Sequence, residues 1–291
     1  MENTVVSDKS PLADESTPQM TDNGENPLNR PLTIVFCLPG ETFSHHFLKS
    51  WSELLLYCVT HKIRPILSNH QSCNIYYVRN MCLGGNVLNG IEQKPFNGQL
   101  DYDFIMWIDS DQVFSVNAFL SLLRHDKDVV SGLYLMKDGV NYTAVQDWDE
   151  SHFLEKGSFK FLNRKSLMGW LDKNAEGNID EKKDQQGNPF KDYSECKIPL
   201  MEVSYTGLGW TLVKKGVYEK MNYPWFYAKK ISMNKSVSVG DDNSSTSIAQ
   251  KMEVVEYTME DVTFFLNLKE HGITPYVDVR SIVGHQKSIV L

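Results

Sequence analysis

Two aspartates separated by one serine, Asp109-Ser110-Asp111, stand where the apolar run DFIMWID ends at Asp109. In an open α/β sheet, ligands bind beyond the carboxyl ends of the strands. Two carboxylates in such a turn can converge on one hard cation, usually Mg²⁺ or Mn²⁺, which also takes phosphate oxygens. The cation would neutralise the charge that develops on a departing diphosphate. The alternative is an ordinary Asp-rich turn, because aspartate side chains also form hydrogen bonds within loops.

A pair of glycines in Gly207-Leu208-Gly209 follows the predicted strand MEVSYT. Glycines one residue apart allow the backbone to come close to a ligand and to present its N–H groups. The same pair also suits a tight connection between two elements with no ligand involved, so this motif alone does not decide between the two interpretations.

An acidic pair, Glu260-Asp261, stands at the start of the segment MEDVTFFLNL, which is predicted to be helical. Thr258 and Asp261 match the T-x-x-D pattern of a helix capping box, which gives the pair a purely structural interpretation. In the functional interpretation, Asp261 is a general base in the first helical turn. We expect the helix N-terminus to favour its ionised form, which would accept a hydroxyl proton.

A histidine, His285, lies in VGHQK beyond the last predicted strand. An imidazole nitrogen combined with carboxylate oxygens suits manganese better than calcium. This interpretation requires the chain to fold back toward Asp111. Otherwise His285 is one of the many histidines that are structural or merely exposed.

Alternating strands and helices are predicted to position these residues. The first half predicts strands at 32–38, 63–69, 103–109 and 129–135, separated by helices at 43–61, 74–88 and 116–125. The second half predicts a surface excursion at 172–196, a strand at 201–209, helices at 212–221 and 258–271, a long mobile loop at 229–251 and a last strand ending near Val279. Buried apolar strands that alternate with helices are typical of a parallel α/β sheet covered on both faces.

The composition is that of a soluble globular protein, with 291 residues, 41% hydrophobic and 23% charged. Residues 1–31 are polar and predict a disordered tail, and residues 32–291 predict one domain. A net charge of −8 argues against a dedicated nucleic-acid binder. Five cysteines without a C-x-x-C, and no signal peptide or transmembrane segment, favour a cytoplasmic protein with reduced thiols.

Taken together, the four motifs resemble those of the GT-A fold of nucleotide-sugar-dependent glycosyltransferases, in particular inverting, family-2-like enzymes. That family has a D-x-D, then a glycine-containing loop, then an acidic x-E-D at a helix start, then a C-terminal histidine. In this chain they stand in the same order as DSD at 109–111, GLG at 207–209, MED at 259–261 and His285. The resemblance extends from residue 32 to the C-terminus.

The resemblance implies a GT-A (Rossmann-like) single domain, with a central, mostly parallel sheet flanked by helices and long active-site loops. It implies that Asp111 and His285 bind Mn²⁺ (or Mg²⁺), and that Asp109 contacts the metal through water or contacts the ribose. Asp261 would be the catalytic base.

The family pattern also implies a donor site and an acceptor site. The donor side, for which a UDP-sugar is favoured, would comprise Leu38, Pro39, Gly40, Glu41, Thr42, Arg79, Asp109 and Ser110. The side facing the acceptor, a glycan or another hydroxyl compound, and the donor sugar would comprise Gly207, Leu208, Gly209, Glu260 and Trp225. For Arg79 the alternative is an exposed helix arginine, and for Trp225 it is a core position.

The implied function is metal-dependent transfer of a sugar from a nucleoside diphosphate to an acceptor hydroxyl, with inversion. A sugar nucleotidyltransferase also combines an α/β sheet, a divalent metal and carboxylates. That class resembles the chain less, because its glycine-rich G-x-G-[ST]-R type loop is replaced here by LPGETF. A non-catalytic nucleotide- or glycan-binding module of the same fold is the other alternative, since intact acidic residues do not prove turnover.

Overall fold

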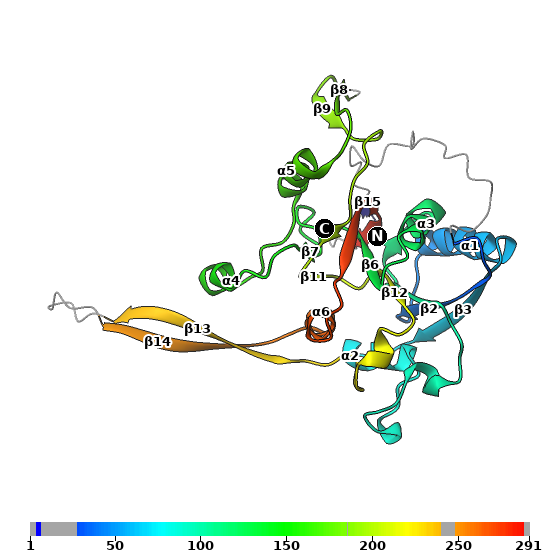
Figure 1. Cartoon of the computed structure of the whole chain (residues 1–291), viewed down its shortest axis with the longest axis horizontal. Helices are drawn as coiled ribbons and strands as arrows, with labels where there is room; N and C mark the ends of the chain where they lie inside the picture. The colour runs from blue at the N-terminus through cyan, green and yellow to red at the C-terminus, as the bar shows by residue number, and fades with distance from the viewer. Residues whose placement is uncertain (1–3, 7–27, 185, 240–247, 288–291) are drawn as a thin grey trace.

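A seven-stranded sheet forms the centre of the protein in a computed structural model that describes residues 4–6, 28–184, 186–239 and 248–287 (Figure 1). Its strands, in spatial order, are β10 (Met201–Glu202), β15 (Tyr276–Ile282), β6 (Val129–Leu133), β12 (Trp210–Lys214), β4 (Phe104–Ile108), β2 (Leu32–Pro39) and β3 (Ile63–His70). Strands β12 and β10 run antiparallel to their neighbours, and the remaining pairs are parallel. The predicted α/β class with a mostly parallel central sheet is confirmed.

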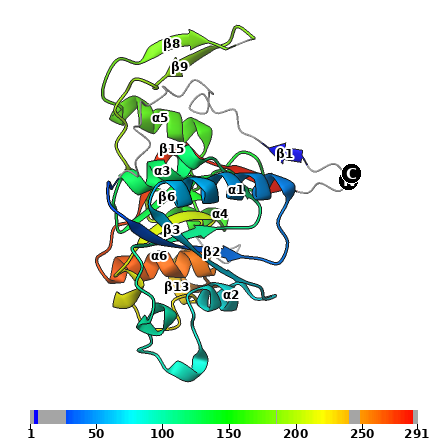
Figure 2. The same ribbon diagram turned by 90° about the vertical axis from the view of Figure 1, so that its right-hand side faces the viewer.

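Helices cover both faces of this sheet (Figure 2). The helices α1 (His45–Thr60) and α3 (Val116–Arg124) pack on one face, and α2 (Ile75–Cys82) and α6 (Glu260–Glu270) pack on the other. Strand β4 illustrates why its sequence is continuously apolar. Phe104 and Met106 point into the first layer and Ile105 and Trp107 into the second, so both faces of the strand are buried.

A small three-stranded sheet lies beside the end of β4 and holds the order β1-β16-β5. It consists of β1 (Thr4–Val6), β5 (Gln112–Val113) and β16 (Gly284–Lys287). Strand β1 falls within the segment predicted to be a disordered tail, and its backbone pairs with the edge of β16. The prediction for residues 1–3 and 7–27 lies outside the described residues.

The excursions from this body are hairpins and short helices. They comprise β7 (Ala144–Val145), which pairs with β11 (Tyr205–Thr206), the helices α4 (Glu150–Lys156) and α5 (Arg164–Asn174), the hairpin of β8 (Asp180–Lys183) and β9 (Pro189–Asp192), and the 3₁₀ turns η1 (Val87–Asn89), η2 (Pro95–Gly98) and η3 (Tyr218–Lys220). The predicted helix at 74–88 is shorter than expected. It ends at Cys82. Two residues later, Gly84 has φ +72°, a conformation that other residues rarely adopt and that does not continue a helix.

Two predicted elements are wrong. The predicted helix at 212–221 is in fact strand β12 followed by η3. The described residues of the predicted mobile loop at 229–251 form most of a hairpin of β13 (Lys230–Val239) and β14 (Ile248–Tyr257), which extends far from the body (Figure 1). The prediction for residues 240–247 lies outside the described residues. The Ser-rich sequence of β13 does not predict a strand, because most of its interactions are with the paired strand β14 and not with an apolar core.

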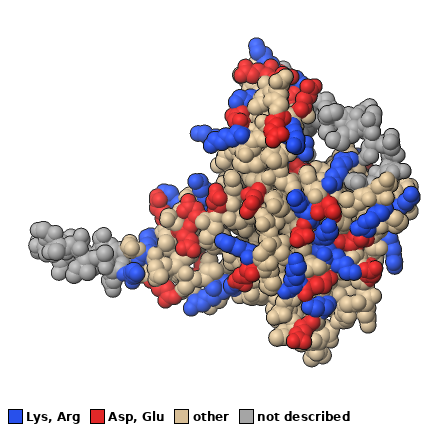
Figure 3. All heavy atoms as spheres, in the orientation of Figure 1, with Lys and Arg blue, Asp and Glu red and all other residues tan. Residues whose placement is uncertain are grey.

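The surface carries charges of both signs. On the face drawn in Figure 3, basic and acidic side chains are interspersed over the body and the hairpins. Among the described residues, no helix is both long enough and apolar enough to cross a membrane.

Candidate active site

A cleft of about 670 Å³ lies beyond the carboxyl ends of β2, β3 and β4. Its lining residues come from the three loops that follow these strands and from α2: Pro39, Gly40, Glu41, Gln71, Ser72, Cys73, Ile75, Val78, Asp109, Ser110 and Asp111. The cleft therefore brings together five of the predicted donor-binding residues, although Leu38 is buried and Thr42 does not line it. A second hollow of about 500 Å³ lies at the opposite ends of β2 and β3, away from the acidic residues.

The loop after β2 fits against the aspartate turn only because residue 40 is glycine. Gly40 has φ +140°, and a Cβ built on it would lie 2.9 Å from the Cβ of Ser110. A side chain here would force apart the two loops that line the cleft, so the tight approach of Pro39-Gly40 to Ser110 depends on this glycine.

Asp111 meets His285 across the small β5–β16 sheet. His285 lies opposite Gln112 in that pairing, and the Gln286 N–H donates to the Asp111 carbonyl at 2.8 Å. This register places His285 Nε2 3.0 Å from Asp111 Oδ2. Burial raises the pKa of Asp111, but its hydrogen bonds with His285 and Lys287 outweigh burial and keep the pKa below its usual range.

The donor set at Asp111 and His285 fits a divalent cation. The Leu135 carbonyl can only accept, so its 2.6 Å contact assigns the ring hydrogen to His285 Nδ1. The other ring nitrogen, Nε2, faces the Asp111 carboxylate. Metal-binding histidines use the same arrangement, in which one ring N–H donates to a carbonyl and the other nitrogen faces the metal. The 3.0 Å between Nε2 and Oδ2 matches adjacent ligands of a cation with bonds of about 2.1 Å.

The protein would supply only part of such a coordination shell. Over the described ranges, no group of three or more His, Cys, Asp or Glu side chains is arranged to hold a metal. Asp109, the third predicted ligand, instead accepts from Arg79 Nη2 at 3.1 and 3.3 Å. A cation held by Asp111 and His285 would keep open positions for water and phosphate oxygens, as Mg²⁺ commonly does.

Arg79 joins two of the predicted acidic site residues inside the protein. Its side chain on α2 is 3% exposed, its Nε donates to Glu260 Oε1 at 3.1 Å, and its guanidinium lies 5.3 Å from the centre of the Trp107 ring. The alternative of an exposed helix arginine is therefore wrong. Arg79 also does not line the cleft, and its contacts are with Asp109 and Glu260 rather than with the space for a donor.

Asp261 stands in the first turn of α6, next to Glu260. Burial, and then the negative charge of Glu260, raise its pKa to about 7. The Val262 N–H in the first turn of α6 donates to Asp261 Oδ1 at 2.7 Å and favours the ionised form, as expected of a helix N-terminus. Desolvation nevertheless outweighs this contribution, so the net shift of the pKa is upward. A carboxyl group with this pKa is well matched to accept a proton near neutral pH.

The predicted capping box at the start of α6 does not form. The N-cap residue is Met259, which has no side-chain cap. The Thr258 hydroxyl instead bonds with the backbone of Lys229 and with the Thr263 hydroxyl. The Asp261 carboxylate is therefore not engaged by Thr258.

The two glycines of the GLG motif accommodate a tyrosine that the sequence did not single out. The Gly209 N–H donates to the Tyr134 hydroxyl at 3.0 Å, and a Cβ at Gly207 would lie 2.2 Å from the same oxygen. A Cβ at Gly209 would also lie 3.0 Å from Asp109 Oδ2. Leu208 is buried in the core, so this segment is a tight internal connection beside Asp109 rather than an open sugar-binding surface.

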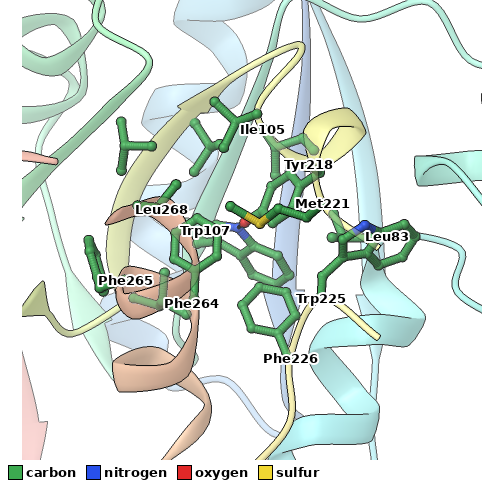
Figure 4. Packing of buried hydrophobic residues seen from close by; sticks show 14 of the residues in the cluster. Leu83, Ile105, Trp107, Tyr218, Met221, Trp225, Phe226, Phe264, Phe265 and Leu268 are labelled. Carbon is green, nitrogen blue, oxygen red and sulfur yellow. Dashed lines mark hydrogen bonds between the residues drawn. The ribbon is translucent and has the colours of Figure 1, made fainter. Parts of the chain in front are cut away.

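Trp225 was a candidate for stacking on a sugar, and the structure rules this out. The side chain is fully buried and packs in the core cluster that contains Leu83, Tyr218 and Met221 (Figure 4). Its backbone N–H donates to Asn80 Oδ1 at 3.0 Å. The apolar run that contains Trp225 therefore fills the core.

Two residues near Asp111 and His285 are not among the residues that the sequence motifs indicate. Tyr134 follows β6, and its ring packs edge-on to His285 at 5.1 Å between centres. Lys287 donates to Asp111 Oδ2 at 2.7 Å. The spacing His285-x-Lys287 was the available signal, because residues two apart on a strand point to the same side.

Comparisons with known proteins add a distant structural likeness. No protein-family model matches the chain, and no curated protein sequence matches it. Among solved structures, that of A197 from STIV is similar, with 16% sequence identity, a TM-score of 0.43, and coverage of 89% of this chain and 86% of that one.

Proposed function

We propose that this protein is a GT-A-type glycosyltransferase that moves a sugar from a nucleoside diphosphate to an acceptor hydroxyl. The observation that carries the proposal is the convergence of Asp111 and His285, which are distant in sequence, at the edge of the cleft that the loops after β2, β3 and β4 form. An imidazole and a carboxylate oriented toward one point, beside a cleft of nucleotide size, suit a metal-bound diphosphate.

The acidic residues take different roles in this proposal. The nucleoside diphosphate occupies the cleft beside Ser110. A divalent cation, Mn²⁺ or Mg²⁺, held by Asp111 and His285, would supply positive charge to the departing diphosphate. Arg79 holds Asp109, which lines the cleft, and Glu260, which begins α6, in fixed positions.

Asp261 acts as the general base. It takes the proton from the acceptor hydroxyl as that oxygen forms its bond to the anomeric carbon. The bond from the same carbon to the diphosphate oxygen breaks, and both of its electrons leave with the nucleoside diphosphate. One displacement of this kind inverts the configuration. A base with a pKa of about 7 is half ionised near neutral pH.

Thermal melting with nucleoside diphosphates tests the proposal. We expect UDP to raise the Tm of the protein in the presence of Mn²⁺, and we expect Asp111→Ala to abolish the Mn²⁺-dependent part of this shift. Asp101→Ala, which removes an exposed aspartate paired with Lys215, is the matched control and should keep the full shift. If no nucleoside diphosphate shifts the wild-type Tm, with or without Mn²⁺, the proposal is wrong.

Product analysis separates transfer from the other activities. Incubation with UDP-sugars and Mn²⁺ should release UDP, slowly to water and faster once an acceptor is found. Release of pyrophosphate from a nucleoside triphosphate and a sugar phosphate would instead identify a nucleotidyltransferase. Binding with no release of any product would identify a non-catalytic module.

A further inference from the structure

The Asp111 carboxylate contacts Lys287 as well as His285. His285 and Lys287 are two residues apart on β16, so both side chains point toward the aspartate turn. Both contact the same oxygen, Asp111 Oδ2, at 3.0 Å from Nε2 and 2.7 Å from Nζ. The Lys287 side chain is 29% exposed and that of Asp111 38%, so the pair lies at the rim of the cleft rather than in the core.

This contact conflicts with binding of a free divalent cation. A cation that coordinates Asp111 Oδ2 would lie within a few ångströms of the Lys287 ammonium, and the two positive charges would repel each other. The ammonium also neutralises part of the negative charge of the Asp111 carboxylate, which would otherwise attract the cation. Free metal must therefore displace Lys287 before it can use Asp111.

A bound diphosphate changes this balance. It brings several negative charges to the same rim, where they offset the repulsion between the ammonium and the cation. The cation then gains phosphate oxygens as ligands, and Lys287 no longer depends on Asp111 for a counter-charge. The same lysine that opposes free metal thus tolerates metal that arrives with the nucleotide.

We propose that Lys287 is a gate on the cation site, which keeps free divalent metal away from Asp111 and His285 and admits it together with a diphosphate. This inference rests on the proposed function, because it takes Asp111 and His285 as the cation site. In this proposal, Lys287 determines that the cation binds together with the diphosphate and not before it, which neither Asp109 nor Asp111 could do. The gate would prevent occupation of the site by metal when no donor is present.

Direct measurement of Mn²⁺ binding by electron paramagnetic resonance tests the gate. The comparison is between the wild type and Lys287→Met, which keeps the length of the side chain and removes its charge. Without nucleotide, we expect Lys287→Met to bind Mn²⁺ about ten-fold more tightly or better, because one nearby positive charge is gone. With saturating UDP, the difference should shrink to about three-fold or less, because the diphosphate already offsets that charge.

Three further variants locate the effect. Lys287→Gln should behave like Lys287→Met, which guards against a packing defect in one variant. The double variant Asp111→Ala/Lys287→Met should lose the gain. Lys191→Met removes a lysine on the distant strand β9 that makes the same 2.7 Å contact to an aspartate, Asp172 on α5, and should leave Mn²⁺ affinity unchanged.

The outcomes separate the gate from the proposed function. Equal affinity for free Mn²⁺ in the wild type and in both Lys287 variants would overturn the gate while leaving the cation site intact. Weaker Mn²⁺ binding in the variants would overturn it as well. No Mn²⁺ binding to any protein, even with UDP, would overturn the gate together with the cation site of the proposed function.

Discussion

Two aspartates two residues apart, Asp109 and Asp111, belong to clusters of opposite character. Asp109, whose side chain is 29% exposed, lies with Glu260 around Arg79, and the side chains of Arg79 and Glu260 are 3% and 7% exposed. Asp111 lies with His285 and Lys287 at the rim of the cleft and is itself 38% exposed. Their pKa values shift in opposite directions: burial raises that of Asp109, whereas hydrogen bonds with His285 and Lys287 prevail over burial and lower that of Asp111.

The two clusters therefore suit two different roles: the first stabilises the site, and the second binds ligands. Removing one member of a buried ion cluster leaves charges without compensation, so such a cluster resists change. A cluster at the rim can exchange partners with ligands at little cost to the fold. We therefore expect the Arg79 cluster to stabilise the fold and fix the geometry, and the Asp111 cluster to respond to nucleotide and metal.

The largest expected effect concerns Asp261, which lies beside the Arg79 cluster. Asp261→Asn should lower the rate of sugar transfer by about 10²- to 10⁴-fold, the usual contribution of a general base, while the UDP- and Mn²⁺-dependent Tm shift stays. Measurement of UDP release at saturating donor and acceptor checks this. Unimpaired transfer would remove Asp261 from the reaction.

Replacement of the buried arginine should affect stability most. Arg79→Met should lower the free energy of unfolding by about 3–5 kcal/mol, because the buried Glu260 and the partly buried Asp109 would keep negative charges with no counter-charge. Urea denaturation measures this, with Lys191→Met as the exposed control, for which we expect a loss of about 1 kcal/mol or less. Similar losses in the two variants would contradict the distinction between the clusters.

The converse experiment is at the rim. Asp111→Ala should change the free energy of unfolding by about 1 kcal/mol or less, because its charge partners are partly solvated. It should nevertheless remove the response to Mn²⁺ in the presence of UDP. A destabilisation as large as that of Arg79→Met would show that the rim cluster is structural too.

The pH dependence of transfer should follow Asp261, whose pKa is about 7. The base is active when ionised, so kcat/KM should rise with pH and level off above about 7. Glu260→Gln should move this limb to lower pH, because Glu260 is the charged neighbour that raises the pKa most. A pH–rate profile of both proteins checks the direction, and a shift to higher pH would be the opposite of what this geometry requires.

Because of Asp261, we also expect the free energy of unfolding to depend on pH. The folded state holds the Asp261 proton up to about pH 7, whereas the unfolded chain releases it near pH 4. The contribution of this group to the free energy of unfolding is therefore fully present below about pH 4 and is lost as the pH rises through 7. Asp261→Asn should flatten this part of the stability curve relative to the wild type, measured by urea denaturation at several pH values.

Much of the sheet follows from local sequence. The run at 32–38 and the run DFIMWID are short, apolar and rich in β-branched or aromatic residues, and they form β2 and β4 within a residue or two of the prediction. The helix predicted at 43–61 forms as α1 because its apolar residues recur every three or four positions. The segment WTLVK was not predicted as a strand, because a short apolar run fits a buried strand or a helix equally well. Its pairing with both β4 and β6 makes it strand β12.

The sequence by itself determined the parts that repeat along the chain: the alternation of strands and helices, the acidic turn after a buried strand, and the acidic pair at a helix start. Tertiary structure alone decided which charges meet, because the partners are far apart in sequence. It placed Arg79 between two carboxylates, buried Trp225, filled the space beside the glycines with Tyr134, and set Lys287 next to His285 on Asp111. The desolvation that raises the pKa of Asp261 is likewise a property of the packed protein, since it depends on what surrounds the carboxyl group rather than on its neighbours in the chain.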